Sequence, residues 1–240
     1  MPSPSAVSRR SFVRAAGTAS LLTAASWGRV AGANERVGVG FIGFGLIGKR
    51  HVLDFQQQPS ANLVAVAEVH RGRLDEARTL IGGSARGYGD FRKLLDDRDV
   101  DAVVISTPDH WHALMTLMAC AAGKDVYVEK PLSLFVREGR WMVDVARRYK
   151  RVVQVGTQQR SGPHYQKARE LIRSGHIGKV MAARMWYYRN VMPGFGSPPD
   201  GDPPPGLDYD LWLGPRRSGP ITRTERSTTS DGSGIIRAAR

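Results

Sequence analysis

The chain has 240 residues, 41% of them hydrophobic, and one cysteine, so it can form a packed core but no internal disulfide framework. More than half of its net charge of +13 comes from its two ends, residues 1–33 and 214–240, and no basic cluster with interleaved aromatics lies between them. This distribution argues against nucleic acid as a partner. Cys120 lies in an apolar run, where a small buried core residue is expected rather than a nucleophile.

The first 33 residues have the pattern of an export signal. Arg9 and Arg10 form the twin-arginine pair of bacterial Tat signals, a mildly apolar stretch follows, and Ala31-Gly32-Ala33 offers small residues for cleavage. The apolar stretch is about half the length that crosses a bilayer as a helix. We expect a twin-arginine signal peptide over 1–33, export by the Tat machinery to the periplasm or cell exterior, and no membrane span after cleavage. The alternative is a disordered basic arm.

From residue 34 onward, short apolar runs alternate with helix-compatible stretches of about ten residues. The expected strands are 37–42, 63–69, a short one near Tyr88, 102–106, 126–128 and 152–155. The expected helices are 47–57, 73–80, 91–95 with Asp90 as N-cap, 113–122 and 136–149. This order predicts βαβ units, and hence an α/β domain with a doubly wound, parallel Rossmann sheet over 34–156.

A glycine motif follows the first expected strand and begins the first expected helix. Gly43, Gly45 and Gly48 match G-x-G-x-x-G: the first glycine permits the tight turn, the second lets the backbone approach a pyrophosphate, and the third lets helix and strand pack closely. The helix N-terminus would then hold the pyrophosphate. The loop predicted to bind the cofactor consists of Gly43, Phe44, Gly45, Leu46, Ile47 and Gly48.

The second expected strand ends near a carboxylate that can accept hydrogen bonds from ribose hydroxyls. Glu68 lies 20 residues after Gly48, which suits the adenosine ribose and favours NAD. The nearby His70, Arg71 and Arg73 could instead serve a 2′-phosphate, so the cofactor is expected to be NAD or NADP.

Two polar segments follow the next strands. Residues 107–112 come at the carboxyl end of a strand, where open α/β sheets bind ligands. There His112 could face a ligand or could simply hold a packed turn. Lys130, between Glu129 and Pro131, could stabilise a developing alkoxide, although an exposed Glu-Lys pair is more often plain surface. The six histidines show no metal-ligand spacing, so no metal site is expected.

After Gly156 the sequence changes in character. A helix is expected over 163–174, an aromatic-rich strand over 179–189, a loop over 194–206 and a short ordered segment over 207–214. Residues 157–214 would then be the start of a second domain. Residues 215–240 contain no long apolar run and are expected to be disordered.

Together these motifs resemble the Gfo/Idh/MocA oxidoreductases, a family named after glucose–fructose oxidoreductase and inositol dehydrogenase. The resemblance rests on Gly43–Gly48, Thr107–His112, Glu129-Lys130-Pro131, Val155–Arg160, Leu171–Lys179 and Asp210–Pro215. It implies that the second domain is an α/β substrate domain with an open antiparallel sheet that also forms homo-oligomers. It also implies hydride transfer at a hydroxyl-bearing carbon of a sugar, cyclitol or related polyol.

The resemblance assigns roles to individual residues. Catalysis would fall to Lys130 and His112, and Gln158 and Arg160 would face the substrate. The residues that would join the glycine loop and Glu68 in binding the cofactor are Thr107, Pro108, His110, Glu129 and Lys130.

The sequence departs from the family after Pro215. Family enzymes continue with a glycine-rich stretch, an Asp and a His that complete the site, and this chain has none of these. Back-translated with permitted codons and read in another frame, residues 216–240 yield an aromatic-rich sequence that resembles the family's continuation. We expect that a single-nucleotide frameshift produced this tail and an incomplete second domain, which leaves the chain impaired. The alternatives are a natural arginine-rich tail and a non-catalytic dinucleotide-binding module.

Overall fold

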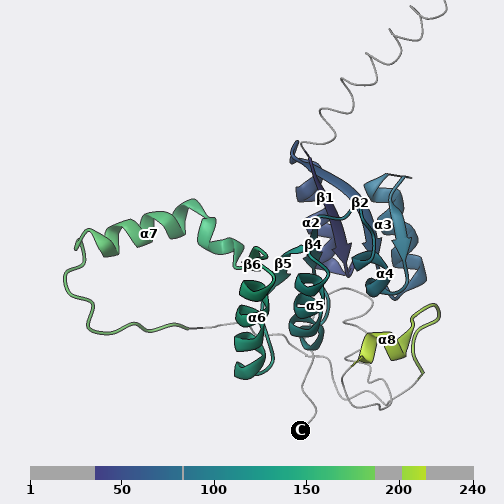
Figure 1. Ribbon diagram of the computed structural model, residues 1–240. Coiled ribbons are helices and arrows are strands. Elements are labelled where there is room, and N and C mark those ends of the chain that lie inside the picture. The colour runs from purple at the N-terminus through teal and green to yellow at the C-terminus, as the bar shows by residue number, and fades with distance from the viewer. Residues whose placement is uncertain (1–35, 83, 187–201, 215–240) are drawn as a thin grey trace, which may run out of the picture.

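The computed structural model describes residues 36–82, 84–186 and 202–214 (Figure 1). The predicted signal peptide over 1–33 and the predicted frameshifted tail over 215–240 lie outside the described residues. Both therefore remain predictions.

Six parallel strands form one sheet in the order β3-β2-β1-β4-β5-β6. The strands are β1 (Val37–Ile42), β2 (Ala61–Ala67), β3 (Arg86–Tyr88), β4 (Ala102–Ile105), β5 (Asp125–Glu129) and β6 (Val153–Gly156). The chain starts in the middle of the sheet, builds outward to β3, and then crosses to β4 on the other side of β1. This doubly wound order confirms the predicted Rossmann domain.

Helices cover both faces of the sheet because its strand residues are apolar on both sides. Val39, Phe41, Val66 and Val104 belong to a buried cluster with residues of α2 (Leu46–Gln56) and α3 (Arg71–Ile81). The alternate strand positions, such as Val103, Ile105, Val126 and Val128, belong to a second cluster. That cluster includes residues of α4 (Phe91–Leu95), α5 (Asp109–Ala121) and α6 (Val136–Arg148).

The residues at the N-termini of α4 and α5 explain where these two helices begin. Asp90 caps α4 as predicted, because its Oδ1 accepts a 2.9 Å hydrogen bond from the Arg92 amide. Helix α5 begins at Asp109, four residues before the expected start at 113. Pro108 provides a fixed φ of −58° at the N-cap, and the Asp109 carboxylate suits the positive end of the helix dipole.

Cys120 is fully buried in the core as predicted, and burial raises the pKa of its thiol to about 11.

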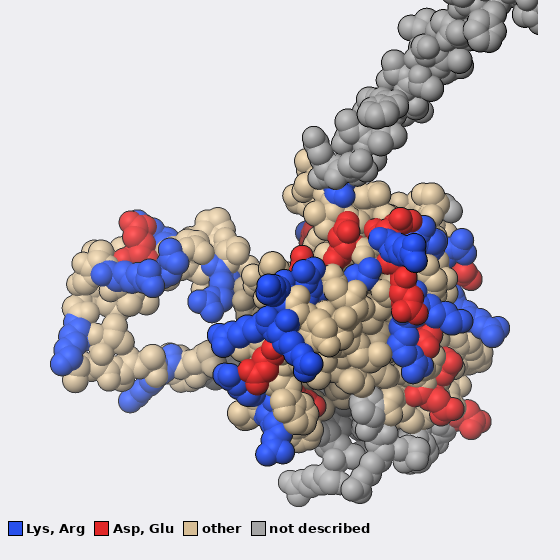
Figure 2. Space-filling view, in the orientation of Figure 1, with Lys and Arg blue, Asp and Glu red and all other residues tan. Residues whose placement is uncertain are grey.

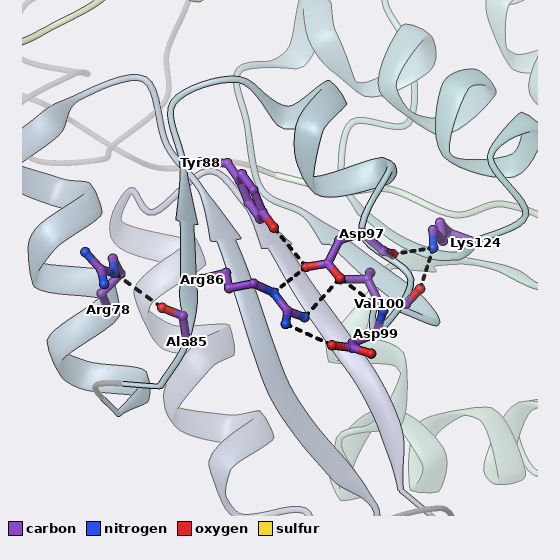
Figure 3. Close-up of polar contacts among 8 residues, drawn as sticks. All are labelled: Arg78, Ala85, Arg86, Tyr88, Asp97, Asp99, Val100 and Lys124. Atoms are coloured by element: carbon purple, nitrogen blue, oxygen red, sulfur yellow. Dashed lines mark hydrogen bonds and ion pairs between the residues drawn. The ribbon is translucent and has the colours of Figure 1, made fainter.

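A polar cluster ties β3 to the loops that precede β4 and β5, and we call it the Asp97 clamp (Figure 3). The Asp97 carboxylate accepts hydrogen bonds from the Arg86 guanidinium at 2.6 and 2.9 Å and from the Tyr88 hydroxyl at 3.0 Å. The Lys124 ammonium donates to the carbonyl oxygens of Asp97 and Val100 at 2.8 and 2.7 Å. The clamp joins segments that belong to different βα units.

Beyond β6 the chain leaves the sheet. A short 3₁₀ helix η1 (Gln158–Ser161) leads into α7 (Pro163–Arg173), which buries none of its residues and stands away from the sheet (Figure 1). The strand predicted over 179–189 was wrong for residues 179–186, which form no regular structure; 187–189 are not described. A strand needs a neighbour to receive its backbone hydrogen bonds, and these residues pair with no described strand.

The last described stretch, residues 202–214, contains α8 (Tyr209–Leu213) and packs against the Rossmann domain. Described residues of the predicted second domain show no antiparallel sheet, so its architecture stays a prediction. We call the segment from η1 to residue 186, which includes α7, the arm. On the face drawn in Figure 2, Lys and Arg side chains lie along the arm and around α6, with Asp and Glu among them. No helix within the described ranges is long and apolar enough to cross a membrane.

Candidate dinucleotide-binding site

A cavity of about 690 Å³ lies at the carboxyl ends of the strands, between the sheet and residues 207–212. Parallel α/β sheets bind ligands at this edge, where the strand order reverses between β1 and β4. The cavity brings together most of the residues predicted from sequence: Gly43, Gly45, Leu46, Ile47, Glu68, Thr107, Pro108, His112, Glu129 and Lys130. Phe44, Gly48 and His110 are buried and do not belong to this lining.

The glycine loop has the geometry that its motif predicts. Gly43 has φ of +89°, and a Cβ there would come within 2.8 Å of the Ser106 carbonyl oxygen. A Cβ on Gly48 would overlap the Gly43 carbonyl oxygen, so only glycine lets α2 approach the loop this closely. Gly45 caps α2 without a side-chain acceptor, and no acidic residue lies in the first turn. The N-terminus of α2 is therefore suited to an anionic ligand.

Glu68 holds the glycine loop as well as lining the cavity. Its Oε2 accepts a 2.7 Å hydrogen bond from the Phe44 amide, and its Oε1 accepts a 2.9 Å bond from the His70 amide. The side chain is buried, and each carboxylate oxygen can accept more than one hydrogen bond. The same carboxylate can thus fix the loop and still accept a ribose hydroxyl.

The two histidines after β4 tie structural segments together. His112 is 1% exposed, with Nδ1 2.6 Å from the Pro131 carbonyl oxygen and Nε2 2.9 Å from the Thr107 carbonyl oxygen. Both partners are acceptors, so the ring joins α5 to the β4–α5 turn and to the segment after Lys130. His110 Nε2 donates to the Trp212 carbonyl oxygen at 3.0 Å. These contacts are positional, and a catalytic role for His112 stays a prediction.

Lys130 lies at the end of β5 and is exposed to the cavity. The neighbouring Glu129 carboxylate accepts from the Lys130 amide at 3.1 Å and pairs with His51 Nε2 at 2.8 Å. Burial raises the pKa of Glu129, but the hydrogen bonds from His51 and the Lys130 amide outweigh that effect and hold the pKa below its ordinary value. His51 comes from α2, so a buried pair links the helix of the glycine loop to the residue before Lys130.

Gln158 and Arg160 lie in η1, exposed and outside the lining of the cavity. Their position follows from register: Gly156 pairs with Glu129, so η1 emerges at the same edge of the sheet as Lys130. The structure places them at the edge of the sheet where Lys130 lies but not in the lining of the cavity. Their role towards a substrate stays a prediction.

The residues of the cavity fit a nicotinamide dinucleotide. Apart from the anion-binding loop and Glu68, the buried Ser106 Oγ has no hydrogen-bond partner in the structure, and Ser106 lines the cavity beside the glycine loop. Such a hydroxyl can donate to a ligand oxygen. The described residues contain no group of three or more His, Cys, Asp or Glu side chains that could hold a metal ion.

Sequence reasoning missed two parts of this site. His51 gives no signal in the sequence, because a histidine on a helix has no visible role until its partner Glu129, at the end of β5, is known. Leu207, Leu211 and Trp212 also line the cavity, and in the sequence they lie more than 70 residues after Lys130, the lining residue that precedes them. Their aromatic and apolar character indicated order but not location, because packing between distant segments leaves no local pattern.

The six-stranded doubly wound sheet, the glycine loop and the carboxylate after β2 define a dinucleotide-binding Rossmann domain. The Gfo/Idh/MocA family, described as an oxidoreductase family with an NAD-binding Rossmann fold, matches residues 37–157. The chain belongs to this family.

Relatives of known name carry the same domain. The inositol 2-dehydrogenase of Salmonella typhimurium is 30% identical over 162 residues, 66% of this chain and 48% of that protein. The scyllo-inositol 2-dehydrogenase (NAD(+)) of Bacillus subtilis is 33% identical over 160 residues, 66% of this chain and 45% of that protein. The chain therefore spans about half the length of the curated relatives it matches.

A solved structure shows the same architecture. The scyllo-inositol dehydrogenase of Lactobacillus casei, crystallised with NAD(H) and scyllo-inositol, superposes with a TM-score of 0.57 at 29% sequence identity. The superposition covers 60% of this chain and 43% of that one.

Proposed function

We propose that this chain is the cofactor-binding part of an NAD-dependent dehydrogenase that acts on a sugar, cyclitol or related polyol. The observation that carries the proposal is that one cavity contains the glycine loop, Glu68 and Lys130. The inositol dehydrogenases among its relatives support a polyol as substrate.

In this proposal, different residues along the cavity bind different parts of the cofactor and the substrate. The N-terminus of α2 binds the pyrophosphate, and Glu68 accepts from the adenosine ribose. Bound NAD would supply a hydride acceptor at its nicotinamide ring. Lys130 stands at the far end from Glu68, where its side-chain nitrogen would hydrogen-bond the substrate oxygen that loses its proton. The Glu129 carboxylate holds the Lys130 backbone in place by accepting a hydrogen bond from the Lys130 amide.

A change of Lys130 to Ala tests this division. We expect the Lys130→Ala variant to bind NADH within a few-fold of wild type, since the pyrophosphate and ribose contacts remain. Oxidation of those polyols that the wild-type chain turns over should fall about 100-fold or more, because removing one positioned donor to a developing oxyanion costs roughly that factor. NADH fluorescence titration and steady-state turnover on a panel of inositols and sugars give the two numbers.

The outcomes separate the competing functions. NADH binding without turnover in the wild-type chain supports the non-catalytic module or an impaired enzyme. Wild-type turnover that Lys130→Ala leaves unchanged contradicts the assignment of Lys130. Lack of NADH binding by the wild-type chain contradicts the whole proposal.

We also propose NAD over NADP, because the carboxylate of Glu68 would repel a 2′-phosphate. Arg73 lines the same part of the cavity and is the group that could offset this repulsion. Parallel titrations with NADH and NADPH decide between them. A lower dissociation constant for NADPH than for NADH would overturn the proposed preference for NAD.

The remaining proposals concern the whole protein: Tat-dependent export to the periplasm or cell exterior, homo-oligomers of full-length relatives, and impaired turnover by this chain. The absence of any buried residue in α7 supports the last of these, because a completed second domain would cover part of that helix. Resequencing the gene tests the frameshift: codons that cannot give the alternative reading of 216–240 would rule it out.

A further inference from the structure

Residues 202–214, which we call the strap, cross the cavity and are fixed at two places. At the first, the Arg71 amide donates to the Gly206 carbonyl oxygen at 2.9 Å and the Asp208 amide donates to the Val69 carbonyl oxygen at 2.9 Å. His70 and Leu207 form an isolated antiparallel bridge between these bonds. The strap is therefore attached to the β2–α3 loop, the same loop that carries Glu68.

The second attachment is at the N-terminus of α5. The Trp212 carbonyl oxygen accepts from His110 Nε2 at 3.0 Å and from Trp111 Nε1 at 2.9 Å. The side chains of Trp212 and Leu213 are buried, and the ring of Trp212 packs against His110 with 5.8 Å between centroids. A Cβ on Gly214 would overlap the Trp111 ring, so the strap ends in close contact with α5.

Between these attachments the strap presents an apolar surface to the cavity. Leu207 and Leu211 are half-buried and line the cavity together with Trp212. The rest of the lining in this region comes from the segments that follow β2 and β3, and it includes Glu68, His70, Arg73, Gly89, Asp90 and Phe91. This part of the cavity is therefore apolar on the strap side and mostly polar in the segments that follow the strands.

The position of this region along a bound dinucleotide follows from the residues at each end. The glycine loop marks the pyrophosphate, and a carboxylate at the end of β2 marks the ribose of the adenosine half. Lys130 marks the opposite end. The base attached to the ribose beside Glu68 must lie next to the β2–α3 loop, which is where the strap is attached. A flat aromatic base suits an apolar wall at that position.

We propose that Leu207 and Leu211 of the strap form the wall of the adenine pocket, so that docking of the strap and binding of the adenosine half stabilise each other. The inference rests on the proposed cofactor site and adds to it a segment far along the chain. The coupling is reciprocal: a ligand that contacts the docked strap favours docking, and an undocked strap weakens binding of the ligand.

Fragment binding to the full chain tests the wall directly. Calorimetry with ADP-ribose and with reduced nicotinamide mononucleotide compares the two halves of the cofactor. Leu211→Ala and Leu207→Ala should each weaken ADP-ribose about 5-fold to 10-fold through lost apolar contact. Binding of the mononucleotide should not change. Leu114→Ala, which truncates an exposed leucine of α5 outside the cavity, is the matched control and should leave both constants unchanged.

Two further measurements exclude trivial loss of structure. Leu211→Met keeps a side chain of similar volume and should bind ADP-ribose within about twofold of wild type. Hydrogen exchange at the Arg71 and Asp208 amides reports strap docking, because both donate across this contact. ADP-ribose should slow this exchange in the wild-type chain, and the mononucleotide should not.

Equal weakening by Leu114→Ala and Leu211→Ala, unchanged ADP-ribose affinity in both strap variants, or exchange that ADP-ribose does not slow would overturn the inference. Lack of ADP-ribose binding by the wild-type chain would overturn it together with the cofactor site. If the strap variants behave as expected but Lys130→Ala leaves turnover unchanged, the inference stands and the assignment of catalysis to Lys130 fails.

Discussion

At the scale of single residues, the buried pair of His51 and Glu129 is the contact that joins the two halves of the site. The His51 and Glu129 side chains are 9% and 4% exposed. A charge buried this deeply is costly unless it is paired, so each partner depends on the other. The sequence predicted Glu129 and Lys130 from a local motif, whereas His51 could be found only from the packing of α2 against β5.

The low pKa of Glu129 predicts a specific pH dependence of stability. Because its pKa is lower in the folded chain than in the unfolded one, the carboxylate stabilises the fold above the unfolded value. That contribution is lost as the pH falls through the folded pKa. We expect Glu129→Gln to cost about 1–2 kcal/mol near pH 7, the difference between a charge-assisted and a neutral hydrogen bond.

Thermal melts of wild type and Glu129→Gln between pH 7 and pH 3 measure this effect. The difference between their melting temperatures should shrink below about pH 4, near the ordinary pKa of a glutamate. Glu170→Gln, on the exposed α7, is the control and should differ little from wild type at any pH. A gap that stays constant down to pH 3 would contradict the proposed ionisation of Glu129.

At the scale of elements, the Asp97 clamp joins β3 to the loops that precede β4 and β5 (Figure 3). Burial raises the pKa of Asp97, but the Asp99 amide, the Tyr88 hydroxyl and the Arg86 guanidinium together bring it below its ordinary value. Asp97→Ala would leave these donors without their acceptor. We expect a loss of about 2–3 kcal/mol in the free energy of unfolding, since hydrogen bonds to charged groups are at the strong end of the range.

Urea unfolding followed by circular dichroism measures the loss. Asp144→Ala is the matched control, because Asp144 forms an exposed pair with Arg140 one helical turn away. Such pairs contribute about 0.3–0.5 kcal/mol, so the control should lie close to wild type. Equal losses in the two variants would show that the clamp is no stronger than an ordinary surface pair.

The same scale shows what a sequence pattern can predict. Strands β1, β4 and β5 and the helices between them were predicted within a few residues because each buries a continuous apolar face. The prediction of a strand over 179–189 was wrong for the described residues 179–186, because aromatic content is only a weak indicator of a strand. Whether such a segment pairs depends on neighbours supplied by distant parts of the chain.

At the scale of the molecule, the chain combines a well-packed sheet with an exposed arm. Between η1 and residue 186, the exposed large apolar side chains are Tyr165, Ile172, Ile177, Val180, Met181, Met185 and Trp186. Apolar surface of this extent marks an interaction site or an aggregation hazard. The sequence shows only that aromatic residues gather near 186, and the extent of the exposed surface follows from the position of α7 away from the sheet (Figure 1).

We expect this arm to drive concentration-dependent association of the purified chain. Light scattering coupled to gel filtration should show a mass that rises with concentration, and a dye that binds apolar surface should fluoresce. The double change Ile177→Ser and Met181→Ser should reduce both signals, because it removes apolar groups that are 58% and 80% exposed. Melting of the Rossmann domain should not change, since neither side chain belongs to its core.

Val136→Ser tests whether the arm itself is responsible. Val136 is 95% exposed but lies at the start of α6, in the Rossmann domain, so its loss should leave association unchanged. A wild-type chain that remains monomeric at all concentrations would show that the arm is covered in solution by another part of the same chain. Equal effects of Val136→Ser and the double change would instead place the surface that mediates association on the Rossmann domain. Only a signal that follows the arm residues supports an unpartnered surface beyond β6.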